Sequence, residues 1–135
     1  MAGKTTAQTD AVLNVLRATN ITAPATVYLG LFSVNPATDG AAGTELTGAG
    51  GYARQAITFG APAAGTGQAR KISNTGLITF GPATGSDWAQ AVGFGIFDAL
   101  TVGNLLYWDS LTTPKTVAVG DSVAFAAAAL VVNED

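Results

Sequence analysis

Short runs of β-forming, mostly apolar residues follow one another along this chain, and no helical pattern separates them. These runs lie at 27–34, 52–59, 72–80, 91–97, 104–110, 117–119, 122–125 and 130–132. Parallel sheets need a long crossover, usually a helix, between successive strands. The sequence therefore predicts a mainly β fold, an antiparallel sandwich with jelly-roll-like topology. Gly30 and Gly95 lie inside two of the runs and predict that another strand or an aromatic ring approaches closely there.

One helical stretch precedes the strands, at residues 5–18. Thr5 followed by Gln8 fits a capping box at its start, and Asn20 is suited to end it in a left-handed conformation. Val12 and Leu16 fall on one apolar stripe at helical spacing. We expect either a helix that packs on the sheet or an arm that lies on a neighbouring subunit.

The domain organisation follows from this change of pattern near Pro24. We predict an N-terminal helical arm at 1–22 and a β-sandwich domain at 23–135. A chain of 135 residues has the usual size of one domain and buries enough surface for one core.

The surface must be unusual, because only 11% of the residues are charged while 48% are apolar. Soluble domains carry about 25% charged residues. This difference favours a protein whose surface meets other proteins. The net charge is −3, and Arg70 and Lys71 are the one adjacent basic pair, so the sequence argues against a nucleic-acid partner. No run approaches the roughly 20 apolar residues of a membrane-spanning helix, so no membrane partner is expected.

Catalytic side chains are scarce. The chain has no His and no Cys, which excludes Ser-His-Asp and Cys-His catalysis and imidazole or thiolate metal sites. Asp98 and Asp109 flank a predicted hairpin and are the one pair that resembles the two carboxylates of a glycosidase. Asp is also favoured at turns and strand ends, and we prefer this interpretation. We predict no enzymatic activity, no cofactor and no metal.

The aromatic residues suggest contact surfaces instead. Tyr107 and Trp108 are consecutive in a predicted strand, so their side chains point to opposite faces. We expect Trp108 in the core and Tyr107 outward, and Trp88 in an exposed loop. Exposed Trp and Tyr anchor protein contacts, and a sugar platform is the alternative. The candidate interface residues are Val12, Leu16, Trp88 and Tyr107.

The order of several motifs resembles a family of small virion proteins of tailed bacteriophages. The motifs are PATVYLGLFSVNP at 24–36, GGYAR at 50–54, ISNTGLITFGPAT at 72–84, FGIFDA at 94–99, GNLLYW at 103–108, LTTPK at 111–115 and GD at 120–121. Members are often labelled tail-fibre proteins, and similar small β proteins decorate phage heads. The resemblance covers about residues 9–132 and implies a structural role in the virion, with no catalytic residue to carry over.

Three functions follow as expectations. The first is a capsid decoration, or cement, protein, which forms a homo-oligomer and stabilises the outer surface of the major capsid protein lattice. The alternative is a tail-fibre or tail-tip module that binds other virion proteins or the host surface. A carbohydrate-active enzyme is a distant third. In the first two cases the protein is located in the virion and is assembled in the host cytoplasm.

Overall fold

The computed structural model describes residues 3–67 and 69–134 and shows a mainly β fold with one α-helix. The elements are β1 (Gly3–Lys4), α1 (Thr6–Val15), β2 (Val27–Val34), β3 (Thr44–Glu45), the 3₁₀ turn η1 (Ala49–Gly51), β4 (Gln55–Ile57), β5 (Ala63–Ala64), β6 (Arg70–Ser73), β7 (Ile78–Phe80), β8 (Ala91–Phe97), β9 (Leu105–Lys115), β10 (Val123–Phe125) and β11 (Val131–Glu134). All the pairings between these strands are antiparallel. The predicted fold class is confirmed.

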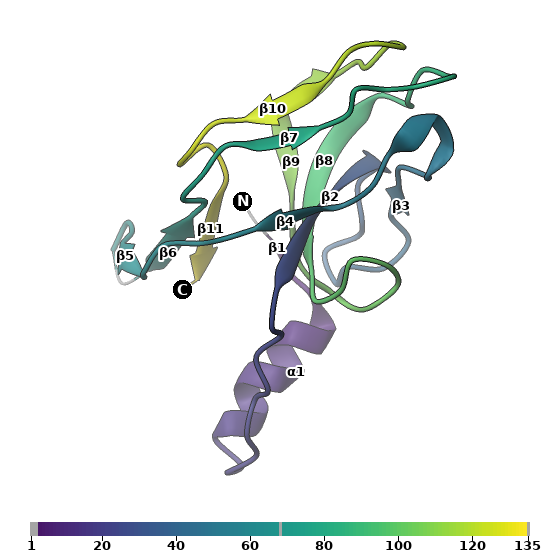
Figure 1. The fold of residues 1–135 in the computed structure, drawn as a ribbon. Coiled ribbons are helices and arrows are strands. Elements are labelled where there is room, and N and C mark those ends of the chain that lie inside the picture. The colour runs from purple at the N-terminus through teal and green to yellow at the C-terminus, as the bar shows by residue number, and fades with distance from the viewer. Residues whose placement is uncertain (1–2, 68, 135) are drawn as a thin grey trace.

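The main sheet has the strand order β1-β9-β8-β2-β3, and β4 pairs with the first half of β2. Two smaller sheets, β10-β7 and β11-β6-β5, contribute to the same core. That core lies against the face of the main sheet that carries alternate residues of each strand, such as Leu29 and Leu31 of β2 and Phe94 and Ile96 of β8. Figure 1 shows β7 and β10 crossing the upper part of β8 and β9, so the layers form a sandwich-like arrangement.

The opposite face of the main sheet is covered as well, and its two glycines make this possible. Gly30 and Gly95 are directly paired between β2 and β8. A Cβ on Gly30 would lie 2.8 Å from the Phe97 ring, and one on Gly95 would lie 2.6 Å from the Phe32 ring. The two rings approach each other at 6.0 Å between centroids. The predicted close approach at both glycines is confirmed.

Several predicted strand bounds are wrong for local reasons. The run at 72–80 is divided into β6 and β7 at Asn74, which is buried. Its side-chain amide donates to the carbonyl oxygens of Gly76 and Ala126, and its side-chain oxygen accepts from Leu130 N. These bonds hold a bend in the backbone at Asn74, so the strand ladder is interrupted there. Residues 117–119 form no strand, and the run at 52–59 contributes only β4.

β9 is longer than the predicted run at 104–110 and continues through Pro114. The register with β8 shifts between the pairs Gly93–Ser110 and Ala91–Lys115. Proline has no N–H for the ladder and is therefore tolerated at such an irregularity. The strand passes through Pro114 for this reason.

Candidate interaction surface

The N-terminal helix α1 projects from the sheets, and residues 16–26 return beside it to β2 (Figure 1). We call residues 5–26 the arm. Its base is firmly attached, because Thr5 is only 3% exposed and its hydroxyl donates to Leu105 O at 2.7 Å. Thr5 N donates to Leu106 O, and β1 just before it pairs with β9. The predicted division at residue 22 therefore leaves one strand of the main sheet on the arm side.

Both helix ends are defined by their caps. The Thr5 hydroxyl accepts from Gln8 N at 3.4 Å, as predicted, although Thr5 N is bonded to β9 and not to Gln8. At the other end, Ala18 adopts φ +57°. Thr19 N donates to Asn14 O and Ala18 N to Val15 O, which is the hydrogen-bond pattern of a Schellman motif. The expectation that Asn20 takes the left-handed position is wrong, since Ala18 takes it.

The arm exposes large apolar side chains. No residue of α1 is buried, and Leu16 at its end is 85% exposed. Ten large apolar side chains are exposed in the part of the chain that the structure describes, and seven of them lie on the arm or on the β8–β9 loop, residues 98–104. These are Val12, Leu13, Val15, Leu16, Ile21, Leu100 and Val102. This end of the molecule therefore holds most of its unpartnered apolar surface.

A groove of about 540 Å³ lies at the base of the arm. Its lining is mostly apolar and includes Ala7, Ala11, Ile21, Val27 and Leu106. Asp98 and Asn104, at the two ends of the β8–β9 loop, also border it. The arm, the groove and the loop therefore form one continuous region, which we call the arm end.

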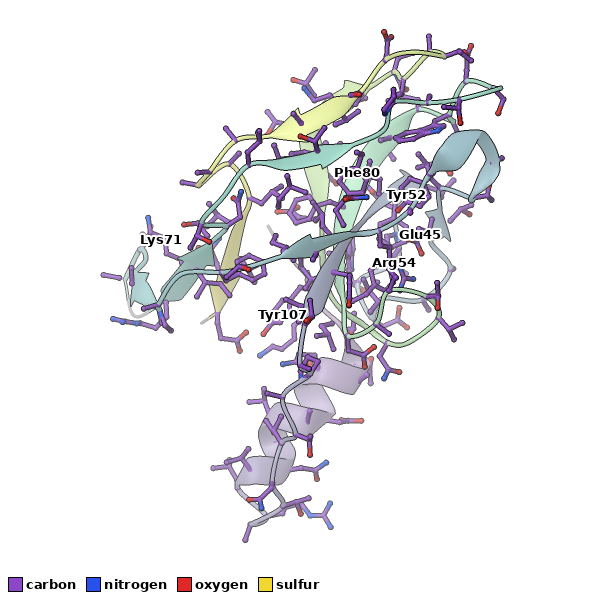
Figure 2. The ribbon with its side chains drawn as sticks, viewed as in Figure 1. Glu45, Tyr52, Arg54, Lys71, Phe80 and Tyr107 are labelled. Atoms are coloured by element: carbon purple, nitrogen blue, oxygen red, sulfur yellow. The ribbon has the colours of Figure 1, made fainter. Side chains whose placement is uncertain are left out.

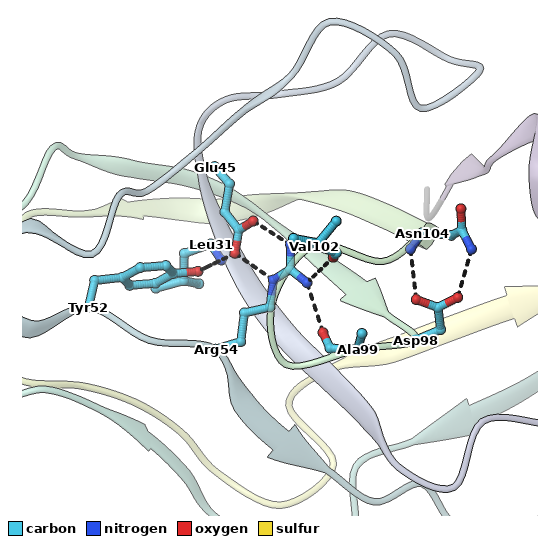
Figure 3. A network of polar contacts seen from close by, with 8 residues as sticks. All are labelled: Leu31, Glu45, Tyr52, Arg54, Asp98, Ala99, Val102 and Asn104. Carbon is cyan, nitrogen blue, oxygen red and sulfur yellow. Dashed lines mark hydrogen bonds and ion pairs between the residues drawn. The ribbon is translucent and has the colours of Figure 1, made fainter.

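The β8–β9 loop is held by a polar network (Figure 3). Arg54 donates to Ala99 O at 2.8 Å and to Val102 O at 2.7 Å, and its other nitrogens bind both oxygens of Glu45. The guanidinium also lies 3.4 Å from the centroid of the Phe97 ring. Its side chain is only 9% exposed, and a charge that is so far desolvated requires partners of this kind.

Tyr52 joins the network to the main sheet. Its hydroxyl donates to Glu45 Oε1 at 2.9 Å and accepts from Leu31 N at 2.8 Å. Leu31 lies on the edge of β2 that pairs with β4 and β3, at the point between these two partners where β2 pairs with neither strand. Burial, together with the nearby Glu45 carboxylate, raises the pKa of Tyr52 well above its ordinary value.

The loop presents a strained apolar tip. Val102 is 86% exposed and has φ +59°, which is rare for a β-branched residue. At the base of the loop, Asp98 accepts from Asn104 N at 2.7 Å and from Asn104 Nδ2 at 2.8 Å. The first of these bonds is the main cause that lowers the pKa of Asp98. Strain that is maintained by such contacts is typical of functional loops.

The structure places the four candidate interface residues differently. Val12 and Leu16 are exposed on the arm. Trp88 is buried, and its indole N–H donates to Gly50 O at 2.8 Å, so the expected exposed loop position is wrong. Its ring instead packs edge-on against Tyr52. A role for any of the four in binding stays a prediction.

Tyr107 and Trp108 do face opposite sides, but in the reverse sense to our expectation. Tyr107 packs against the core and donates to Glu134 Oε2 at 2.8 Å. Trp108 lies on the other face, beside Gly3, and is half-buried. The alternation predicts two faces but not which face is the core, because that depends on which strands cover it.

The carboxylates do not form a catalytic pair. Asp98 is bonded within the loop, whereas Asp109 pairs in register with Phe94 of β8. The two are therefore separated by about four residues of strand, roughly 13 Å. No three acidic side chains among the residues described are close enough to hold a metal ion. No helix in the described ranges is long and apolar enough to cross a membrane.

The sequence of residues 3–133 matches the model of a protein family described as Podophage GP4 fiber I protein gp80. The chain belongs to this family. It is thus a structural protein of a bacteriophage virion, as the resemblance implied. No curated protein matches the chain. For a member of the fiber I family, the arm end is the candidate functional site, because assembly needs contact surface rather than reactive groups.

Sequence reasoning missed part of this site. Leu100 and Val102 were not singled out, nor was Arg54, which holds the loop that carries them. Two apolar residues separated by one threonine in a turn-forming segment, LTVGN at 100–104, are the signal that was available. Arg54 gave no local signal, since its partners are distant in sequence.

Proposed function

We propose that this chain is a non-enzymatic structural module of a phage fibre and that it is joined to neighbouring virion proteins through the arm end. The observation that carries the proposal is the concentration of exposed apolar side chains there, seven of ten in the described residues. A monomer normally keeps such patches small, and larger ones mark interaction sites. The family name, which refers to a fibre protein, supports the same function.

The family match favours the tail-fibre alternative over capsid decoration, which was our first expectation. Its description names a fibre and not a head protein. A decoration protein would bind the major capsid protein in a lattice, and this partner stays a prediction. We accordingly propose other fibre or tail proteins as partners and assembly in the host cytoplasm.

The absence of catalysis is part of the proposal. Asp98, the carboxylate that we considered for glycosidase chemistry, is used to close the β8–β9 loop. Asp98→Asn should therefore change the order of the β8–β9 loop. Neither the parent chain nor this variant should have hydrolytic activity. Release of sugars from host envelope polysaccharides by the purified chain, abolished by this substitution, would contradict the proposal.

Copy number and position in the particle test the proposal. Quantitative mass spectrometry of purified virions should find tens of copies or fewer, and gold-labelled antibodies should mark the tail region. Hundreds of copies, with label over the head, would contradict the fibre function and restore the decoration alternative. In the same particles, Leu16→Asp should reduce incorporation, while Leu77→Asp, an exposed leucine outside the arm, should not.

A further inference from the structure

We infer that the arm pairs with the arm of a second copy of this chain, antiparallel and about a two-fold axis. The inference deepens the proposed function and rests on it in one respect, that the arm is an assembly surface. It names the partner and the relative direction of the two helices. Three features of the arm carry it: its outer stripe, its charges and its projection from the body.

The helix has two distinct sides. Ala7 and Ala11, one turn apart, line the groove and face the body. Val12 and Leu16, also one turn apart, are rotated about the helix axis by about 100° and about 140° from the direction of Ala11. They form an exposed stripe with Leu13 at its edge. Small residues therefore face the body, while the large apolar residues face away from it.

The two charges of the arm are self-complementary. Asp10 and Arg17 are seven residues apart, or about two turns and 10 Å, so they lie on one side of the stripe. In a parallel pair, like charges would meet at both positions. In an antiparallel pair centred between Leu13 and Asn14, Asp10 of each copy meets Arg17 of the other. No salt bridge occupies either residue in the part of the chain described.

The position of the arm allows this pairing. The helix extends away from the sheets, so two antiparallel arms place the two bodies at opposite ends (Figure 2). Only about three helical turns are available to each copy, which is small beside the roughly 800 Å² per partner of a standard interface. We therefore expect a dissociation constant on the order of 1–100 μM for the isolated chain.

Charge exchange tests the inference, with the full chain and sedimentation equilibrium. Asp10→Arg and Arg17→Asp should each weaken dimerisation at least tenfold, because like charges then meet twice. An equimolar mixture of the two variants should form a heterodimer at least as tight as the unchanged homodimer. The double variant Asp10→Arg/Arg17→Asp should dimerise again. Lys115→Asp, an exposed charge reversal on β9, should leave dimerisation unchanged.

Two results would overturn the inference. The first is that the parent chain stays monomeric at concentrations above about 1 mM, which is ten times the largest dissociation constant expected here. The second is a mixture of the single variants that associates no more tightly than either alone, which excludes the antiparallel pairing. If Leu16→Asp still lowers incorporation into virions in either case, the arm binds a different protein, and the proposed function stands without this inference.

Discussion

The Arg54 network and the arm are opposites. The network buries polar and charged groups, whereas the arm exposes apolar side chains to water. The network buries most of the Arg54 guanidinium and the Tyr52 phenol and part of the Glu45 carboxylate, and it provides each with partners. The arm leaves its large apolar side chains exposed and buries none of its helical residues. The polar groups of the network find their partners within the chain, whereas the apolar surface of the arm has no such cover and would be buried only in the contact proposed above. On the proposed function, this contrast separates residues that serve folding from residues that serve assembly.

The largest expected effect lies in the core, below the network. Phe80 is completely buried and stacks on Tyr52 at 6.0 Å between ring centroids. Phe80→Ala should lower the free energy of unfolding by about 3–5 kcal/mol, because it removes a buried ring and leaves a cavity. Urea unfolding followed by circular dichroism measures this. Val12→Ala on the arm is the control and should change stability by less than about 0.5 kcal/mol.

A smaller effect is expected when the network loses its cation. Arg54→Met keeps most of the apolar stem but leaves two loop carbonyls without their donor and Glu45 with only the Tyr52 hydroxyl. Glu45 is partly exposed, so the cost should be about 2–3 kcal/mol, below that of a fully buried pair. The β8–β9 loop should also lose protection in hydrogen exchange. Equal protection in variant and parent would show that Arg54 does not hold the loop.

The network should also make stability depend on pH at the alkaline end. The pKa of Tyr52 is raised in the folded protein, so the unfolded chain releases this proton first. The stability is complete below the unfolded pKa of about 10 and falls above it, by up to about 1.4 kcal/mol for each pH unit. Tyr107 has a raised pKa for the same main reason, burial, and adds to the fall.

The two tyrosines are distinguished by substitution. Tyr52→Phe should lower stability at neutral pH, because Leu31 N loses its acceptor, and should reduce the slope of stability against pH above 10. Stability measured by urea unfolding at pH 8–11 provides the comparison. An unchanged slope in Tyr52→Phe would mean that the buried hydroxyl does not couple folding to pH.

The sequence predicted the features that depend on local patterns. β2 and β8 have the predicted bounds, because continuous apolar runs specify strands that are covered on both faces. Thr5 was found from capping chemistry, and Gly30 and Gly95 from their position inside strands. Val12 and Leu16 were found from helical spacing.

Features that depend on distant partners could not be predicted in this way. Arg54 meets loop carbonyls more than forty residues away, and Asn74 meets Ala126 and Leu130. The burial of Trp88 depends on η1, whose Gly50 carbonyl accepts its N–H. Composition indicated surplus apolar surface, but only the structure locates it at the arm end.

The central claim is that the arm's apolar stripe serves assembly and not folding, and one paired measurement tests it. Leu16→Asp and Leu77→Asp each place a charge at an exposed leucine, one on the arm and one just before β7. The free energy of unfolding of each variant, measured by thermal denaturation, should stay within about 0.5 kcal/mol of that of the parent chain. Sedimentation should then show that only Leu16→Asp abolishes self-association. A Leu16→Asp chain that loses more than about 2 kcal/mol of stability, or that associates as Leu77→Asp does, would contradict the account.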